Sequence, residues 1–112
     1  NDLLSGGEGG DVLLGGSGLD RLNGGSGSDA LTGGSAADTF VFLNGNGLDR
    51  ITDFAGNDFI EINRTTADGF AALMTHASQI GEDIVFDFGG GDQLALADRL
   101  MSVLNSGDFL FV

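Results

Sequence analysis

A repeat of nine residues governs this sequence. Residues 6–41 divide into four consecutive units that each begin with two glycines: GGEGGDVLL, GGSGLDRLN, GGSGSDALT and GGSAADTFV. The sixth place of each unit is an aspartate and the eighth is a large apolar residue. Because one such unit cannot bury its apolar residue alone, a period this short predicts a stack of small coils.

The same spacing continues on both sides of these four units. Asp2 and Leu4 fit it one unit earlier, so we expect the chain to be part of a longer polypeptide with an upstream domain. After Phe42 the spacing shifts by two residues and then resumes over residues 44–52 and 53–61. A second repeat, with a period of 34, aligns residues 47–62 with residues 81–96, which contain DFAGND and DFGGGD.

The glycine-rich sextets are typical of turns, and the apolar triplets between them are typical of short strands. A coil with two turns and two strands takes two units, or 18 residues. Equivalent turns of successive coils then lie about one strand spacing, ~4.8 Å, apart. The sequence therefore predicts an all-β fold, a right-handed parallel β-roll over residues 1–62.

Residues 63–112 are expected to cap this roll. The period of 34 equals one coil of 18 plus an insertion of 16, placed at residues 63–78. The spacing of Phe70, Leu73, Met74 and Ala77 predicts a helix over about 66–77. A last β-roll coil over 81–96, a short helix over about 98–105 and a terminal strand over 108–112 complete the prediction.

Composition excludes several kinds of function. The formal charge of -13 argues against a nucleic-acid or anionic-membrane surface, and no segment is apolar for long enough to insert into a membrane. With no cysteine and one histidine, the chain cannot form a thiolate metal site. It contains no HExxH and no GxSxG motif, so we expect no catalysis from these residues.

Stacking in coils of 18 residues places aspartates over one another. The expected pairs are Asp11 over Asp29, Asp20 over Asp38, Asp29 over Asp49 and Asp38 over Asp58. The period of 34 extends the stack to Asp83 over Asp49 and Asp92 over Asp58.

Like charges this close oppose folding unless a cation lies between them. Ca²⁺ accepts carboxylate and backbone carbonyl oxygens together, whereas Mg²⁺ requires tighter octahedral geometry and zinc prefers histidine or cysteine. The stack therefore predicts several Ca²⁺ ions, about four to six.

These repeats resemble the RTX (repeats-in-toxin) family of calcium-binding proteins secreted by Gram-negative bacteria. The tail, with its doubled DF motif and its final DFLFV, is similar to the C-terminal domain of serralysin-type and other type I secreted proteins. The resemblance implies an extracellular module that folds when it binds calcium. It also implies that residues 108–112 form a secretion signal for the type I secretion machinery.

The resemblance further implies which atoms bind the ions. In RTX rolls the earlier turn of a pair supplies its Asp and the carbonyls of its second and fourth places, and the later turn supplies its Asp and the carbonyls of its first and third places. Carried over to this chain, the ligand sets are Gly7, Gly9 and Asp11 with Gly24, Ser26 and Asp29; Gly16, Gly18 and Asp20 with Gly33, Ser35 and Asp38; Gly25, Gly27 and Asp29 with Asn44, Asn46 and Asp49; and Gly34, Ala36 and Asp38 with Asp53, Ala55 and Asp58. Further ligands are expected at Asp83, Asp87 and Asp92.

A second interpretation remains open. Roll-shaped R-modules accompany the catalytic part of alginate epimerases, and a calcium-lined face of this kind could bind an acidic polysaccharide. The chain has only four arginines and no Trp or Tyr, which gives such a surface few groups for binding sugars.

Overall fold

The structure is a computed structural model, and it describes residues 2–42, 47–55, 57–62, 69–89 and 91–112. The regular elements of these residues are mostly short strands joined by turns, with one short α-helix and two single turns of 3-10 helix. The strands are β1 (Leu3–Ser5), β2 (Val12–Leu14), β3 (Arg21–Asn23), β4 (Ala30–Thr32), β5 (Thr39–Phe42), β6 (Leu48–Ile51), β7 (Phe59–Ile62), β8 (Ala77–Ile80), β9 (Asp83–Gly89), β10 (Asp92–Leu96) and β11 (Phe109–Phe111). The helical elements are α1 (Phe70–Met74), η1 (Met101–Val103) and η2 (Ser106–Asp108).

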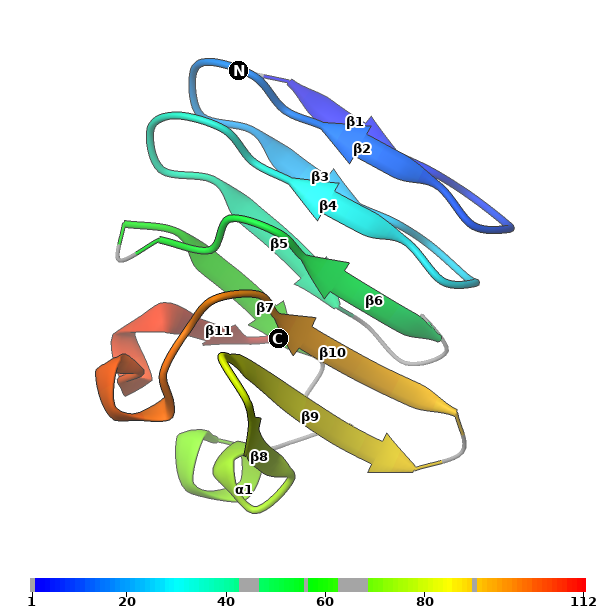
Figure 1. The fold of residues 1–112 in the computed structure, drawn as a ribbon. Helices are drawn as coiled ribbons and strands as arrows, with labels where there is room; N and C mark the ends of the chain where they lie inside the picture. Colours follow the sequence, from blue (N-terminus) through cyan, green and yellow to red (C-terminus); the bar gives the residue numbers. More distant parts are fainter. Residues whose placement is uncertain (1, 43–46, 56, 63–68, 90) are drawn as a thin grey trace.

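Alternate strands of the repeat belong to two different sheets that face each other (Figure 1). One sheet, called sheet A here, has the order β1-β3-β5-β7-β11, and all its pairs are parallel. The other, sheet B, has the order β2-β4-β6-β10-β9-β8 and is parallel as far as β10. The register sets Leu22 opposite Phe40, one coil of 18 residues away. The parallel β-roll is confirmed, and its handedness stays a prediction.

The eighth place of each unit points between the two sheets. Within β1 to β4, the three-residue strands of the repeats, the central side chain is the most buried, as Leu22 and Leu31 show with 0 % and 1 % exposure. Its neighbours face outward because side chains alternate along a strand. This alternation explains why one large apolar residue per unit is enough to line the interior.

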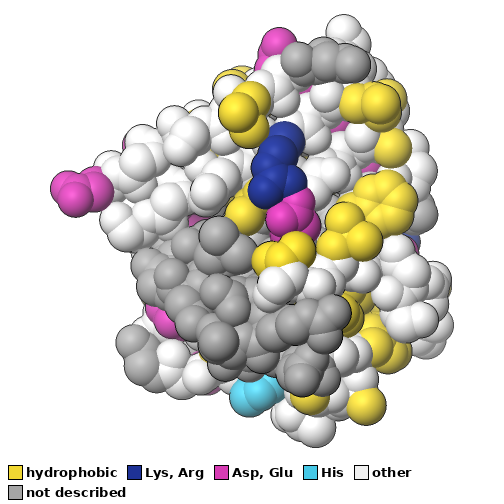
Figure 2. All heavy atoms as spheres, turned by 180° about the vertical axis from the view of Figure 1, so that it is seen from behind, with side chains coloured by type: hydrophobic (Ala, Val, Ile, Leu, Met, Phe, Trp, Pro, Cys, Tyr) yellow, Lys and Arg dark blue, Asp and Glu magenta, His cyan; other side chains and the backbone are white. Residues whose placement is uncertain are grey.

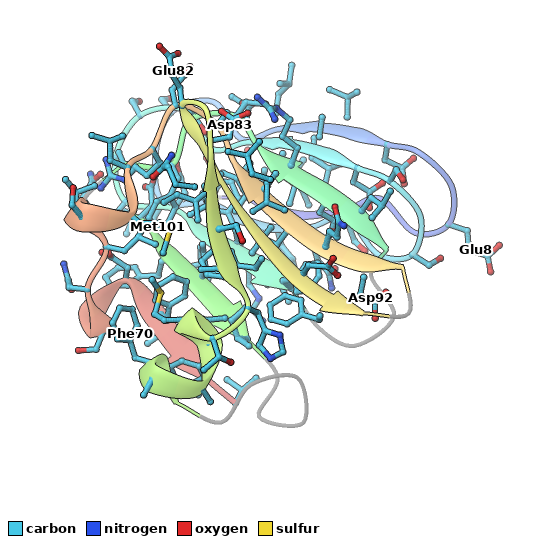
Figure 3. The ribbon with its side chains drawn as sticks, turned by 60° about the horizontal axis from the view of Figure 1, so that its bottom comes forward. Glu8, Phe70, Glu82, Asp83, Asp92 and Met101 are labelled. Atoms are coloured by element: carbon cyan, nitrogen blue, oxygen red, sulfur yellow. The ribbon has the colours of Figure 1, made fainter. Side chains whose placement is uncertain are left out.

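The core becomes larger toward the C-terminal end of the roll. Leu4 and Leu13 in the first coil are only partly buried, whereas aromatic rings fill the interior beyond β5. The ring of Phe109 lies 6.0 Å from that of Phe86, edge to face. α1 and the segment around η1 close this end, where Phe70 and Met101 pack against the core (Figure 3). None of the described helices is long and apolar enough to cross a membrane.

The insertion differs from the helix expected over 66–77. The described helix, α1, contains only five residues, Phe70–Met74, and residues 66–68 lie outside the described part of the chain. Ala77 does not continue the helix but begins β8, which pairs antiparallel with β9. A helix this short has little stability of its own, so sheet hydrogen bonds determine the conformation of the residues that follow it.

The last coil, expected over 81–96, is instead a hairpin. β9 pairs antiparallel with β10, and only β10 continues the roll through its parallel pairing with β6. The connection includes Gly89 and Gly91, both at positive φ, which a tight hairpin turn requires. The short helix expected over 98–105 is reduced to the single turn η1. The terminal segment forms β11, which pairs with β7.

Candidate metal sites

Two columns of aspartates run along the roll, one at each row of turns. The first column contains Asp11, Asp29 and Asp49, and the second contains Asp2, Asp20, Asp38 and Asp58. In each column the amide of one aspartate donates to Oδ1 of the aspartate one coil later. The distances are 2.8 Å from Asp11 to Asp29, 3.2 Å from Asp29 to Asp49, 3.0 Å from Asp20 to Asp38, 2.9 Å from Asp38 to Asp58 and 2.7 Å from Asp2 to Asp20. The structure thus brings together the four pairs that a coil of 18 residues predicts.

Most of these carboxylates are buried. Asp20, Asp29, Asp38, Asp49 and Asp58 are all at most 3 % exposed. Oδ2 of Asp11, Asp29 and Asp38 is buried and has no hydrogen-bond partner among the described residues. A desolvated carboxylate oxygen without a partner is costly, so these atoms indicate a ligand of opposite charge.

The pKa of Asp38 reflects this environment. Burial raises the pKa of this carboxyl above its ordinary value, and the charges of Asp58, Asp20 and Asp53 raise it further, while the hydrogen bond from the Asp20 amide acts in the opposite direction. Without a counter-ion the folded roll therefore favours the protonated form of Asp38 more than the unfolded chain does. A bound cation would reverse this preference, because it stabilises the carboxylate.

Carbonyl oxygens from the next coil converge on the same points. A Cβ built on Gly6 would lie 2.5 Å from Asp11 Oδ2 and 2.7 Å from the carbonyl oxygen of Gly24. One built on Gly15 would lie 2.5 Å from the carbonyl oxygen of Gly33 and 2.7 Å from Asp20 Oδ2. The spaces beside Gly6 and Gly15, called cradles below, are therefore each lined by a carboxylate of the earlier coil and a first-place carbonyl of the later one.

Alternating backbone conformations build these cradles. The second and fourth places have positive φ in Gly7 and Gly9, Gly16 and Gly18, and Gly25 and Gly27, and then in Gly34 and Ala36. Glycine adopts this conformation without strain, and Ala36 is the exception among the repeats. The stacked turns are in close contact, since a Cβ on Gly25 would lie 2.9 Å from the carbonyl carbon of Gly7.

The chemistry of the donor set fits calcium. Among the described residues, no three His, Cys, Asp or Glu side chains come together. The stacked turns of Asp11 and Asp29, and those of Asp20 and Asp38, instead combine two carboxylates with a backbone carbonyl, all hard oxygen donors of the kind that Ca²⁺ takes. For the first two expected ligand sets, every residue is described and lies in the stacked turns. The third includes Asn44 and Asn46, which lie outside the described residues.

The fourth expected set is arranged differently. The carboxylate of Asp53 accepts the amides of Gly33 and Gly34, at 2.9 and 2.8 Å. Ala55 donates its amide to Oδ2 of Asp58, at 2.9 Å. These hydrogen bonds were not anticipated from the sequence, although the change from GG to DF at residues 53–54 was a signal that this turn differs from the others.

The expected stacking of Asp83 over Asp49 and of Asp92 over Asp58 is wrong, because residues 81–96 form a hairpin. Leu94 lies opposite Asp49 in the sheet, and Asp92 accepts the amide of Gly47 at 3.2 Å. Asp92 thus joins the end of the first column, while Asp83 lies at the other end of the hairpin (Figure 3). Asp87 is exposed and accepts the amide of Gly89 at 2.9 Å.

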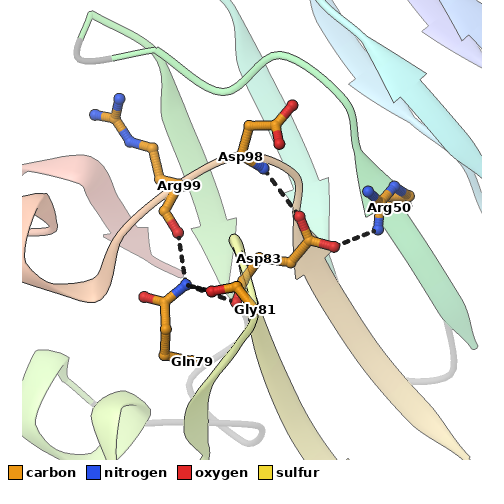
Figure 4. A network of polar contacts seen from close by, with 6 residues as sticks. All are labelled: Arg50, Gln79, Gly81, Asp83, Asp98 and Arg99. Carbon is orange, nitrogen blue, oxygen red and sulfur yellow. Dashed lines mark hydrogen bonds and ion pairs between the residues drawn. The ribbon is translucent and has the colours of Figure 1, made fainter.

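Asp83 belongs to a polar network outside both columns (Figure 4). It accepts the amide of Asp98 at 3.0 Å and pairs with the guanidinium of Arg50 at 3.2 Å. The Asp98 amide and then Arg50 lower the pKa of the Asp83 carboxyl. In the same region, the side-chain amide of Gln79 donates hydrogen bonds to the carbonyls of Gly81, Asp83 and Arg99. These partners give Asp83 a structural role in joining the hairpin to the roll.

A shallow groove of about 530 Å³ follows the outer face of sheet A. Leu3, Leu19, Arg21, Thr39 and Phe59 are among its lining residues. Figure 2 shows this face, where hydrophobic side chains flank a pair of opposite charges. Arg21 forms an ion pair with Glu61, two strands away, which sequence reasoning did not find.

Comparison with known proteins agrees with this geometry. A family model described as the RTX calcium-binding nonapeptide repeat, in four copies, matches residues 5–40 and 14–48. Comparison with curated protein sequences gives no match.

Two solved structures resemble nearly the whole chain. An extracellular lipase, LipA from Serratia marcescens, aligns with 96 % of this chain at 26 % identity and a TM-score of 0.73. This chain spans only 20 % of that lipase. The R3 subunit of a mannuronan C5-epimerase, AlgE6 from Azotobacter vinelandii, aligns with 97 % of this chain and 78 % of its own length, at 26 % identity and a TM-score of 0.64.

Proposed function

Residues 5–48 are RTX calcium-binding nonapeptide repeats, and from this premise we propose that the chain is a calcium-dependent folding module of a secreted protein, with no catalysis of its own. The observation that carries the proposal is that buried Oδ2 atoms of stacked aspartates, those of Asp11, Asp29 and Asp38, have no hydrogen-bond partner among the described residues. Bound calcium supplies the positive charge that offsets these carboxylates.

Without calcium, the burial of apolar side chains contributes little to the stability of the first coils. Leu4 and Leu13 are only partly buried, and burying a leucine fully contributes about 1.5–3 kcal/mol. Ordering the nine residues of a unit costs about 1–2 kcal/mol each in backbone entropy. The roll is therefore expected to unfold where calcium is scarce. It folds where sites of ~10⁻⁴–10⁻³ M affinity fill, as in the extracellular medium.

Substitution of Asp29 tests this proposal, because Asp29 belongs to two stacked pairs, one with Asp11 and one with Asp49. Asp29→Asn should raise the calcium concentration at the folding midpoint at least about tenfold, since it removes a charged ligand. Asp87→Asn is the matched control, since Asp87 is exposed and lies outside the columns. Equal midpoints for the two variants would contradict the proposal.

The proposal includes export by a type I secretion machinery that recognises residues 108–112. In the folded chain Phe109 is 4 % exposed and β11 is an integral strand of sheet A, so the segment is available only before folding. Deletion of residues 104–112 should therefore abolish export. Phe86→Ala, which weakens the core but leaves residues 108–112 unchanged, should still be exported. Unchanged export of the deletion variant would refute this part of the proposal.

A second candidate function is binding of an acidic polysaccharide, and the groove on sheet A favours it. Phe59 is 37 % exposed there and offers an apolar ring face to a sugar, next to Arg21, whose guanidinium pairs with Glu61. Calcium-loaded protein titrated with alginate oligomers should then show saturable binding that Phe59→Ala weakens. Absence of saturable binding would leave calcium-dependent folding as the only function proposed.

A further inference from the structure

We propose that Asn23 and Asp53 are positioning residues of the two calcium sites that the cradles form. Each side chain holds, from outside the cradle, the peptide bond whose carbonyl oxygen lines it, and neither side chain is a ligand of the ion. Asp53 has the larger effect because it is charged. This inference rests on the proposed function and names two residues that set the calcium affinity of these sites.

The carbonyl oxygens of Gly24 and Gly33 each line one cradle. The first converges with Oδ2 of Asp11, and the second converges with Oδ2 of Asp20. In each cradle the two oxygens come from successive coils, so the position of the carbonyl decides whether one cation can contact both. A residue that fixes this carbonyl therefore affects calcium binding without being a ligand.

The amide groups that share a peptide bond with these carbonyls are those of Gly25 and Gly34. The described residues contain no cis peptide bond. In a planar trans peptide the N–H and C=O groups point in opposite directions. An acceptor that holds the amide on one side therefore directs the carbonyl to the other side, into the cradle.

Side-chain oxygens hold both of these amides. The Gly25 amide donates to Oδ1 of Asn23 at 3.0 Å, within the same turn. The Gly34 amide donates to Oδ2 of Asp53 at 2.8 Å, and the Gly33 amide donates to Oδ1 of the same carboxylate at 2.9 Å. Asp53 belongs to the next coil, so its carboxylate fixes the peptide bonds on both sides of Gly33.

The first coil provides an internal comparison. Its first-place carbonyls, those of Gly6 and Gly15, line neither cradle. Among the described residues, no side chain accepts the amides of Gly7 or Gly16, which share peptide bonds with these carbonyls. Side-chain acceptors thus hold the two peptide bonds that line a cradle but, within the described part of the chain, not the two equivalent ones that do not.

The two acceptors differ in charge. A hydrogen bond to a carboxylate is roughly twice as strong as one to a neutral amide oxygen. Such a bond also polarises the peptide, which increases the negative charge on its carbonyl oxygen and strengthens the contact with a cation. Asp53 accepts two amides and Asn23 accepts one. We therefore expect Asp53 to contribute more to the affinity of its site.

Calcium occupancy measured at each cradle tests the inference. Crystals of the whole chain are equilibrated with a series of calcium concentrations, and the occupancy of each ion is refined. In Asp53→Asn, the concentration for half occupancy between Asp20 and Asp38 should rise at least about tenfold, the lower end of the loss that partners of metal ligands cause. Occupancy between Asp11 and Asp29 should not change, and it serves as the control within the same crystal.

The reverse exchange, Asn23→Asp, should act on the other site and in the opposite direction. The concentration for half occupancy between Asp11 and Asp29 should fall about fivefold, because a charged acceptor replaces a neutral one. Ser5→Asp is the matched control. Ser5 lies opposite Asn23 in sheet A and gains the same charge, but the next carbonyl, that of Gly6, lines neither cradle. Ser5→Asp should therefore change this concentration far less.

The outcomes separate the inference from the proposed function. Equal changes at both sites, no change at the site named, or equal effects of Asn23→Asp and Ser5→Asp would overturn the inference. A residue that only supports the fold would not change the occupancy of one site alone. If wild-type crystals held no ion in either cradle at saturating calcium, the proposed function itself would fail, and the inference with it. Should Asp53→Asn fail to fold, Asn23→Asp decides alone.

Discussion

The close stacking of turns can be tested with one pair of glycine substitutions, Gly25→Ala and Gly7→Ala. Both glycines have φ +84°, so alanine is strained equally at the two positions. They differ in what the new methyl group meets. A Cβ on Gly7 has nothing within 4 Å, whereas a Cβ on Gly25 lies 2.9 Å from the carbonyl carbon of Gly7 and closer still to its oxygen. The comparison therefore isolates the contact between successive coils.

The magnitudes follow from these contacts. Placing alanine in the left-handed region costs about 1–2 kcal/mol, and both variants share this term. In Gly25→Ala the methyl group needs a carbon–carbon separation of about 3.5–4.0 Å, so the coils must separate by roughly 0.6–1.1 Å. That movement weakens two cross-coil hydrogen bonds, from Gly6 to Asn23 and from Asp11 to Asp29. Their loss adds about 1–3 kcal/mol.

Urea unfolding at saturating calcium measures both costs. Gly7→Ala should lower the free energy of unfolding by about 1–2 kcal/mol and Gly25→Ala by about 2–5 kcal/mol. Calcium affinity should fall only in Gly25→Ala, because its methyl group would displace the carbonyl of Gly7, which belongs to the ligand set expected between Asp11 and Asp29. A difference between the two variants of less than about 0.5 kcal/mol would refute the reasoning.

Three further predictions concern charge and packing. In chelator, the raised pKa of Asp38 means that the folded chain binds a proton more tightly than the unfolded chain. Stability without calcium should therefore rise as the pH falls toward the ordinary aspartate pKa, and Asp38→Asn should reduce this pH dependence in circular dichroism. Phe109→Ala should cost about 3–5 kcal/mol in urea unfolding, because the ring is buried in the core; its control Leu110→Ala, 45 % exposed, should cost far less. Arg21→Ala should cost less than about 1 kcal/mol in the same assay, since its ion pair with Glu61 is partly exposed; a larger loss would show that this pair supports sheet A.

The roll could be predicted from the sequence because two places of each unit have separate physical tasks. The eighth place puts Leu22 and Phe40 between the sheets, and the sixth place puts Asp20 and Asp38 in one column. With both places fixed, the coil length of 18 residues determines the register. The slip after Phe42 did not disturb this result, since Asp29 still contacts Asp49 and Asp38 still contacts Asp58.

The C-terminal half was harder to predict because its local patterns fit more than one structure. The apolar spacing that suggested a helix as far as Ala77 is interrupted by pairing between β8 and β9, which the local sequence does not encode. Residues 81–96 repeat the residue types of residues 47–62, but their first strand, β9, runs antiparallel to its neighbours in the sheet. A hairpin through Gly89 and Gly91 reverses the chain, and Asp83 therefore meets Arg50 and Asp98 rather than Asp49.

The candidate metal sites also include some features that the sequence predicted and others that it did not. The cradles at Gly6 and Gly15 combine oxygens from the turns that the family pattern names. At Asp53 the pattern indicates a carbonyl ligand, whereas the structure uses the side chain as a hydrogen-bond acceptor. Spacing alone cannot distinguish these roles, because both place Asp53 next to Gly33 and Gly34. The neighbouring Phe54, which has no positive φ, accounts for the difference.

The most direct test of calcium-dependent folding is far-ultraviolet circular dichroism of the full chain during a titration with Ca²⁺, starting in chelator and with Mg²⁺ as the control. The stacked, buried carboxylates predict a cooperative change from coil to β structure with Ca²⁺ alone, because only then are their charges offset. A spectrum that is already folded in chelator and does not change on addition of Ca²⁺ would contradict the account. It would mean that packing of the core around Phe40, Phe86 and Phe109 is sufficient to hold the roll.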